Sequence, residues 1–314
     1  PGGGFAPGGG LYRNNRGVLT RNAAQPSGIS QATSALWTDA DNDGDIDMFF
    51  SITRGGFGGG NGNEALLLND GSGKFTRITN GVAVASGGSS TTAAWADYDG
   101  DGDLDAFVGN ADGEVKFLFR NDGNGAFTQI FGEIADEEGS VESAAWGDFD
   151  NDGWIDLYVA NTQGEGNFLF QNRGDGSFVK VEVGSVTGER ANASSAVWVD
   201  VDNDGDLDLF VTRFGEQNAL YLNQSSTNAW LGVKLIGLAS NRNGIGAKVR
   251  VKATIHGKER WQLREIAARD SGGSPNANRA EFGLGDASTV ATVRIEWPSG
   301  VVTELNNVAS RQFI

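Results

Sequence analysis

The chain of 314 residues contains no cysteine, one histidine, one methionine and five prolines. Without cysteine it forms no disulfide, so its stability must come from packing or from bound metal. The lack of cysteine also excludes a Cys–His catalytic pair, and the single histidine, His256, would have to serve in any Ser–His–Asp triad. It precedes a glycine in KATIHGKER, which predicts a surface turn, and no G-x-S-x-G, P-loop or H-E-x-x-H motif is present. We therefore expect no enzymatic activity and no catalytic residues.

Long apolar runs are also missing, since none approaches the 18 residues of a membrane helix, and we expect no membrane insertion. The charge is one-sided: 24 Lys and Arg stand against 41 Asp and Glu. Residues 1–224 carry 12 basic and 34 acidic residues, whereas residues 225–314 carry 12 basic and 7 acidic residues. An acidic chain repels phosphate backbones, so no nucleic-acid partner is expected. The change of charge predicts a domain boundary near residue 225.

Glycine, in contrast, is abundant. The segment PGGGFAPGGG (1–10) predicts a flexible arm, or an arm that docks on a neighbouring subunit. The run RGGFGGGNGN (54–63) predicts an exposed connection. The chain opens at Pro1 without an initiator Met, which suggests a processed or trimmed N-terminus.

One acidic motif occurs four times, each time two residues after a Trp. The copies are WTDADNDGDIDMFF (37–50), WADYDGDGDLDAFV (95–108), WGDFDNDGWIDLYV (146–159) and WVDVDNDGDLDLFV (198–211). The shared spacing is D-x-D-x-D-G-x-x-D, followed by an apolar run. Four solvated acidic turns would have no reason to repeat this spacing and its glycine.

The spacing suits a calcium loop. Ca²⁺ takes six to eight oxygen ligands, which side chains at positions 1, 3, 5 and 9 and the backbone carbonyl at position 7 can supply, while Gly at position 6 allows the sharp turn. We expect about four Ca²⁺ ions, one in each loop. Trp154 at position 7 fits this scheme, because a residue that offers only its carbonyl can carry any side chain. The predicted ligands are Asp39, Asp41, Asp43, Asp45, Asp47, Asp97, Asp99, Asp101, Asp103, Asp105, Asp148, Asp150, Asp152, Trp154, Asp156, Asp200, Asp202, Asp204, Asp206 and Asp208.

An EF-hand is the other calcium-binding alternative. It requires a bidentate Glu at position 12, where this chain has Phe50, Val108, Val159 and Val211. β-Branched and aromatic runs flank the loops in place of helices. The motif therefore predicts calcium loops between strands.

A second motif is an apolar strand that ends in Asn before a Gly-rich turn, which is typical of a hairpin. It is found in LYRNNRG (11–17), LLLNDGSGKFT (66–76), FLFRNDGNGAFT (117–128), FLFQNRGDGSFV (168–178) and LYLNQSS (220–226). The first Asp of successive loops recurs after 58, 51 and 52 residues. Such a repeat of about four short strands predicts a blade of a β-propeller, with Trp37, Trp95, Trp146 and Trp198 in the core between blades.

Residues 11–224 resemble the FG-GAP/VCBS calcium-loop repeats. This resemblance implies propeller blades whose calcium ions lie in loops between strands. Residues 225–314 resemble the ASPIC/UnbV domain through NGIGA (243–247), QLRE (262–265), FGLG (282–285) and WPSG (297–300). The fold expected is all-β: four calcium-loop blades, incomplete or closed by extra strands, followed by a small C-terminal antiparallel β domain.

The functional expectation is an extracellular or cell-surface, calcium-stabilised structural or adhesive module, because millimolar extracellular calcium would fill such loops. Its partner would be another copy, sharing strands in a filament, or another extracellular protein. One alternative is a carbohydrate-binding propeller that binds a glycan through exposed Trp154 and Phe57. A third is a polysaccharide-active enzyme that uses the acidic cluster Glu133, Asp136, Glu137 and Glu138.

Overall fold

The computed structural model describes residues 11–15, 18–21, 29, 32–55, 60–224, 227–267 and 279–314. The glycine-rich arm predicted at 1–10 lies outside these residues, as does Phe57. In the described ranges no helix has both the length and the apolar character needed to cross a membrane.

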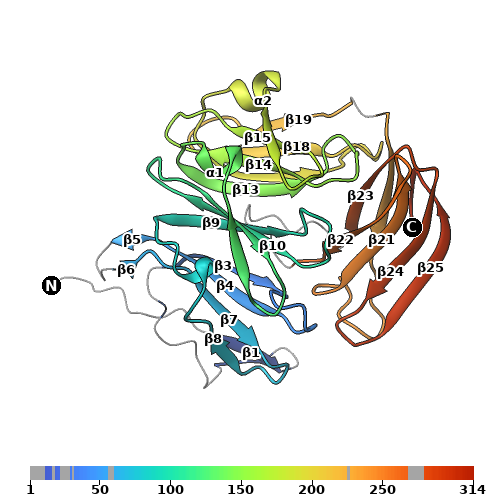
Figure 1. Ribbon diagram of the computed structural model, residues 1–314, viewed down its shortest axis with the longest axis horizontal. Coiled ribbons are helices and arrows are strands. Elements are labelled where there is room, and N and C mark those ends of the chain that lie inside the picture. Colours follow the sequence, from blue (N-terminus) through green and yellow to red (C-terminus); the bar gives the residue numbers. More distant parts are fainter. Residues whose placement is uncertain are drawn as a thin grey trace.

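Four antiparallel sheets follow one another along the chain, and each repeat forms one of them (Figure 1). The first contains β3 (Ala32–Thr38), β4 (Asp47–Ile52), β7 (Ala65–Asn69) and β8 (Phe75–Arg77). The second contains β9 (Ser90–Ala96), β10 (Asp105–Asn110), β11 (Phe117–Asn121) and β12 (Phe127–Ile130). The third contains β13 (Val141–Gly147), β14 (Asp156–Asn161), β15 (Phe168–Asn172) and β16 (Phe178–Val181). The fourth has three strands, β17 (Ala193–Val199), β18 (Asp208–Arg213) and β19 (Ala219–Tyr221). We refer to them as blades 1 to 4, and their arrangement confirms the predicted all-β, propeller-type fold.

The first strands of the blades pack on one another: β9 lies between β3 and β13, and β17 lies on β13. This close approach is possible because these strands are rich in alanine, and Ala93, Ala144 and Ala196 are almost completely buried. Figure 1 shows the blades as a fan whose open side faces the C-terminal sheets.

The aromatic residues before the loops fill the contacts between blades. Trp146 stacks on Tyr98 of the preceding blade at 6.2 Å, and Trp198 lies 6.5 Å from Phe149. The expectation of a buried Trp is wrong for Trp37, which is 39% exposed because no described blade precedes β3.

The C-terminal region forms two sheets around its own core, with strand orders β23-β20-β26 and β22-β21-β24-β25. The strands are β20 (Ala229–Lys234), β21 (Lys248–Ile255), β22 (Lys258–Glu265), β23 (Arg279–Gly285), β24 (Thr289–Glu296), β25 (Val302–Ala309) and β26 (Gln312–Phe313). Val249, Val251, Phe282 and Val293 are among the buried residues between them. The pairing is antiparallel as predicted, except that β26 runs parallel to β20.

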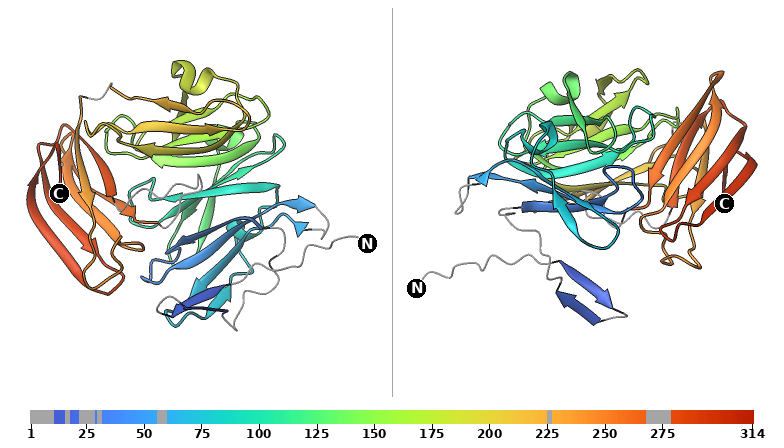
Figure 2. Two further views of the ribbon diagram at one scale, coloured as in Figure 1. Left: turned by 180° about the vertical axis from the view of Figure 1, so that it is seen from behind. Right: turned by 60° about the horizontal axis from the view of Figure 1, so that its bottom comes forward.

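Among the described residues, three short helical segments lie between strands: η1 (Val82–Val84), α1 (Glu133–Asp136) and α2 (Gly184–Gly188). The hairpin predicted at 11–17 is present as β1 (Tyr12–Asn15) and β2 (Val18–Arg21), which form a sheet of their own (Figure 2). At the two ends of the glycine-rich insertion, β5 (Arg54–Gly55) pairs with β6 (Gly60–Asn61), and residues 56–59 between them lie outside the described residues.

Candidate metal sites

Each acidic loop leaves the first strand of its blade and enters the second. The glycine at position 6 has a left-handed backbone in every loop, with φ of 95° at Gly44 and 93° at Gly205. Position 4 is also left-handed and holds Asn in three loops, for example Asn42 at φ 61°. These two residues turn the chain back on itself, so that alternate aspartates converge.

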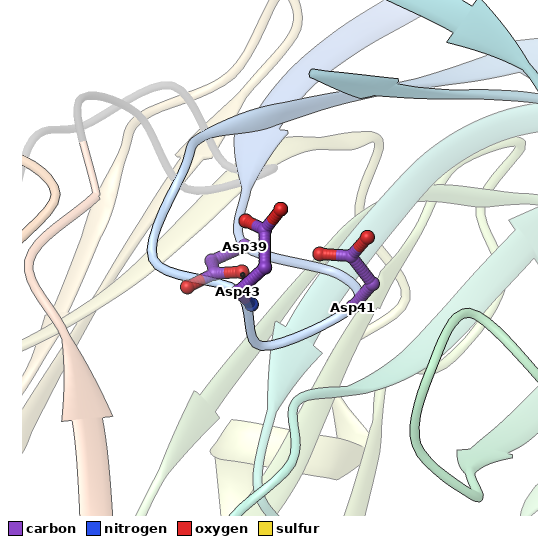
Figure 3. A group of neighbouring side chains, drawn as sticks. All are labelled: Asp39, Asp41 and Asp43. Carbon is purple, nitrogen blue, oxygen red and sulfur yellow. Dashed lines mark hydrogen bonds between the residues drawn. The ribbon is translucent and has the colours of Figure 1, made fainter. Parts of the chain in front are cut away.

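The turn gathers three carboxylates in each loop, whose nearest oxygens all lie within 4.8 Å of one another. Figure 3 shows the group in loop 1. Positions 1 and 3 contribute in every loop, position 5 joins them in loops 1 and 2, and position 9 joins them in loops 3 and 4. The groups are Asp39, Asp41 and Asp43; Asp97, Asp99 and Asp101; Asp148, Asp150 and Asp156; and Asp200, Asp202 and Asp208.

The first aspartate is held in place by the loop backbone. The amides of Asp43 and Gly44 donate to the two oxygens of Asp39 at 3.1 and 3.0 Å. The amides of Asp152 and Gly153 do the same for Asp148 at 3.0 and 2.9 Å. These carboxylates are therefore oriented before any ion binds.

The ninth aspartate joins the loop to the third strand of the blade. Both oxygens of Asp105 accept backbone bonds, from Tyr98 at 3.0 Å and from Asn121 at 2.8 Å. Asp47, Asp156 and Asp208 make the same two bonds in their own blades. A residue predicted only as a ligand thus also has a structural role.

The loops concentrate negative charge at buried positions. Burial raises the pKa of Asp97 to about 7 and that of Asp105 to about 9. The pKa of Asp148 is raised by burial first and then by the charges of Asp152 and Asp150. A cation among these groups would favour their ionised forms.

The donor set fits a hard divalent cation. Asp41 Oδ1 and Asp200 Oδ1 are buried and accept no hydrogen bond from the residues that the structure describes, which is costly for a carboxylate oxygen unless a cation is bound. Carboxylate and carbonyl oxygens are the ligands that Ca²⁺ prefers. Asp45, Asp103, Trp154 and Asp206 remain the predicted carbonyl donors.

One asparagine per repeat has a function that its place in the hairpin motif did not reveal. Asn172, at the end of β15, donates to Ile155 O in its own loop at 3.1 Å and to Tyr98 O in the preceding loop at 2.8 Å. Asn121 and Asn223 make the equivalent bonds to Ala40 O and Phe149 O. The sequence did contain a signal for this contact, because an Asn recurs at this position in every repeat although a hairpin turn does not require Asn there.

Side chains at positions 4 and 7 connect neighbouring loops. Asn42 Nδ2 donates to Asp103 Oδ1 at 2.7 Å, and Asn151 Nδ2 donates to Asp206 Oδ1 at 2.9 Å. Between loops 2 and 3 the pair is replaced by Gly100 and Trp154, and the indole ring lies close to the glycine. The sequence interpretation assumed that any side chain is tolerated at position 7. These contacts show instead that the side chain there is constrained by the neighbouring loop.

Trp154 is also less exposed than the carbohydrate-binding alternative requires. Its ring is half-buried, packs against Gly174 and lies 4.2 Å from the guanidinium of Arg260. The acidic cluster of the third alternative is partly neutralised, because Glu137 pairs with Lys180 at 2.9 Å. His256 is exposed in a turn, as predicted.

A cavity of about 130 Å³ lies between the first strands of the blades and the C-terminal sheets. Trp95, Trp146, Arg264, Glu265 and Glu281 are among the residues that line it. Its lining joins residues of all four blades to residues of β22 and β23, so the C-terminal region closes the open side of the fan.

Residues 39–108, 97–159 and 148–211 match the FG-GAP-like repeat family, and residues 237–314 match the ASPIC and UnbV family. The chain belongs to the FG-GAP-like repeat family. Repeats of this FG-GAP family commonly bind calcium, and the four aspartate groups could hold a metal.

This FG-GAP-like chain is 26% identical to mouse cartilage acidic protein 1 over 95% of its own length and 47% of that protein. It is 28% identical to the human protein over 80% of its own length and 39% of that protein. The chain thus spans less than half the length of these relatives.

Among solved structures, the FG-GAP-like chain is similar to an Agrocybe aegerita lectin that recognises non-reducing terminal N-acetylglucosamine. That match has 17% identity and a TM-score of 0.43, and it covers 92% of this chain and 85% of the lectin. The V. cholerae biofilm matrix protein Bap1 matches with 13% identity and a TM-score of 0.35, over 87% of this chain and 48% of Bap1.

Proposed function

We propose that the protein is a non-enzymatic, extracellular structural or adhesive module whose blades are stabilised by calcium. The observation that carries the proposal is the fourfold gathering of three carboxylates within 4.8 Å. In two of the loops a buried carboxylate oxygen has no hydrogen-bond donor. Extracellular calcium is concentrated enough to fill loops of this kind, and the name of the curated relatives is consistent with an extracellular protein.

A bound calcium ion would neutralise the carboxylates of its loop, and hydrogen bonds from that loop would extend the stabilisation to the neighbouring strands. The first aspartate orients the loop backbone, the ninth aspartate binds the third strand, and the asparagine at the end of that strand reaches the preceding loop. An ordered loop therefore stabilises two blades. Without the ion, like charges remain buried together, which favours protonation or unfolding.

Elemental analysis of the purified protein should find about four calcium ions per chain. Chelation should lower the melting temperature by about 10 °C or more, because a ligand that binds only the folded state stabilises it by mass action. Asp41→Asn should remove one equivalent, whereas Asp175→Asn, at an exposed hairpin turn, should keep all of them. A metal-free protein with an unchanged melting temperature would refute the calcium role.

The partner proposed for the adhesive role is a second copy of the chain. Blade 4 has three strands in the described residues, and Leu220 in its last strand and Leu222 just after that strand are 49% and 54% exposed. The separate β1–β2 hairpin exposes Val18 and Leu19, so its outer strand could pair with β19 of a neighbour. Head-to-tail pairing of this kind would produce an open filament.

Electron microscopy and sedimentation in calcium test this assembly. The wild-type protein should form filaments at high concentration, and Leu220→Lys should abolish them. Leu238→Lys, at a leucine that is almost fully exposed in the C-terminal region, is the matched control and should assemble normally. A wild-type protein that remains monodisperse would rule out strand sharing while leaving the calcium role intact.

A further inference from the structure

The C-terminal sheets contact all four calcium loops, and their basic side chains form an ion pair or a hydrogen bond with three of these loops. In loop 1, Lys248 Nζ lies 2.6 Å from Asp39 Oδ2 and also contacts the Asn42 side chain. In loop 2, the guanidinium of Arg250 donates to Gly102 O at 3.4 Å. In loop 4, Arg279 lies 3.6 Å from Asp200 Oδ2. Figures 1 and 2 show these sheets beside the blades.

These contacts divide the loops into two classes. The first aspartate of loops 1 and 4 forms an ion pair with the C-terminal region. The first aspartate of loops 2 and 3, Asp97 and Asp148, takes part in no ion pair within the described part of the chain. The C-terminal groups that hydrogen-bond to loop 3 are neutral, since the amide of Gly285 donates to Asn151 O at 2.8 Å and Asn228 Nδ2 donates to Asp150 O at 2.9 Å. The buried guanidinium of Arg264 lies near both Asp97 and Asp148, but no ion pair joins it to either of them within the described residues.

We propose that Lys248, and more weakly Arg279, lower the calcium affinity of loops 1 and 4, so that calcium fills loops 2 and 3 first. This inference rests on the proposed calcium function. It assigns the C-terminal region a role in setting the relative calcium affinities of the four loops, in addition to covering the loops.

The charge of Lys248 is held close to the predicted ion. A calcium ligand oxygen lies 2.3–2.6 Å from the ion, so an ammonium bonded to the same carboxylate is within a few ångströms of it. The Lys248 side chain is only 8% exposed, which prevents it from turning into solvent and keeps the repulsion poorly screened. Glu265 also lies near Lys248, but no ion pair joins these two described residues.

A basic side chain beside a ligand could instead raise the calcium affinity by orienting the carboxylate. In loop 1 the carboxylate is already oriented without Lys248, because the amides of Asp43 and Gly44 bond both oxygens of Asp39. The repulsion should therefore dominate. Arg279 is farther from its carboxylate and pairs with Glu281 at 2.5 Å as well, so its effect on loop 4 should be smaller.

Calcium titration of the full chain against a chromophoric chelator tests the ranking. The wild type should bind two equivalents tightly and two more weakly. Lys248→Met should strengthen one of the weak equivalents about threefold or more, while Lys248→Arg should keep it weak because the charge remains. Lys252→Met is the matched control: Lys252 is on the same strand but pairs with Glu259 at 2.7 Å, so its loss should change no site.

Asp41→Asn assigns the affected equivalent to loop 1. In that background the Lys248→Met change should leave the remaining equivalents unaltered, and melting of the calcium-loaded variants verifies that each one folds. Unchanged or weaker binding by Lys248→Met would overturn the ranking while the proposed calcium function stands. A wild type that binds no calcium would overturn both.

Discussion

Single side chains fasten neighbouring blades together. The Asn at the end of each third strand bonds its own loop, and from blade 2 onward it also bonds the preceding loop. In blade 1, Asn69 bonds Ile46 O in its own loop, and no bond from it to another blade is found in the described chain. Blade 1 therefore provides an internal comparison for the contribution of the second bond.

Asn172→Ala should lower the free energy of unfolding by about 2–3 kcal/mol, because it leaves Tyr98 O and Ile155 O without this donor in a buried site. Asn69→Ala, which breaks only contacts within its own blade, should cost about 1 kcal/mol. Urea unfolding in saturating calcium measures both values. Equal losses would show that the bond between blades contributes nothing.

Glu64 is a buried acid that the calcium loops do not use. It accepts bonds from Ser86 Oγ at 2.6 Å and Ser90 Oγ at 2.5 Å, and burial raises its pKa. Glu64 therefore holds its proton more tightly in the folded protein than in the unfolded chain. Its contribution to the free energy of unfolding is consequently largest at low pH and declines as the pH rises above the ordinary pKa of 4.5.

Glu64→Gln cannot ionise, so the variant should gain stability relative to the wild type as pH increases. Each unit of raised pKa corresponds to about 1.4 kcal/mol of this difference. Thermal unfolding of both proteins at pH 4 and pH 8, with calcium saturating, isolates the effect. A difference that does not change with pH would contradict the assignment.

At the scale of the element, consecutive loops are matched to each other through positions 4 and 7. Two contacts use an Asn with an Asp, and the middle one uses Gly100 with Trp154. Trp154 also packs on Gly174 of its own blade and beneath Arg260 of β22. One side chain thus joins two loops and a strand of the C-terminal region.

Trp154→Ala should lower the free energy of unfolding by about 3–5 kcal/mol, the usual cost of truncating a large aromatic residue in a packed site. It should leave the number of bound calcium ions unchanged, since the backbone carbonyl remains. Trp261→Ala, at a Trp that is 39% exposed, is the control and should cost clearly less. The double variant Gly100→Asn with Trp154→Asp should be more stable than Trp154→Ala, because it introduces the Asn–Asp pair that joins the other neighbouring loops.

At the scale of the whole molecule, the C-terminal sheets close the fan by approaching the loops very tightly. The backbone of Gly283 runs beside loop 3, where a Cβ would overlap the Asp148 carboxylate and lie 2.5 Å from Asn151 Cα. The amide of Gly285 in the same strand bonds Asn151 O at 2.8 Å. Only glycine allows this approach at position 283.

Gly283→Ala should therefore separate β23 from loop 3 and lower the melting temperature by about 4–8 °C, equivalent to about 2 kcal/mol or more for a chain of this size. Gly188→Ala is the control, because a Cβ there would meet nothing within 4 Å. Differential scanning calorimetry of both variants in calcium measures the effect. An unchanged transition for Gly283→Ala would show that the contact is not tight in solution.

The sequence by itself determined the blades, the loops and their likeness to one another. Alternating aspartates with a glycine at position 6 allow one local conformation, and this conformation depends on residues that are neighbours in the chain. For the same reason the strands and hairpins could be predicted from short-range patterns.

Only the tertiary structure decided which loop contacts what. The pairing of Asn42 with Asp103, the packing of Trp154 on Gly100 and the contact of Lys248 with Asp39 join residues that are 50 to more than 200 positions apart. No local pattern specifies such contacts, because they arise from the packing of blades and sheets as whole bodies. The predicted exposure of Trp154 was wrong for this reason, whereas three of the four aspartates predicted as side-chain ligands do converge in each loop.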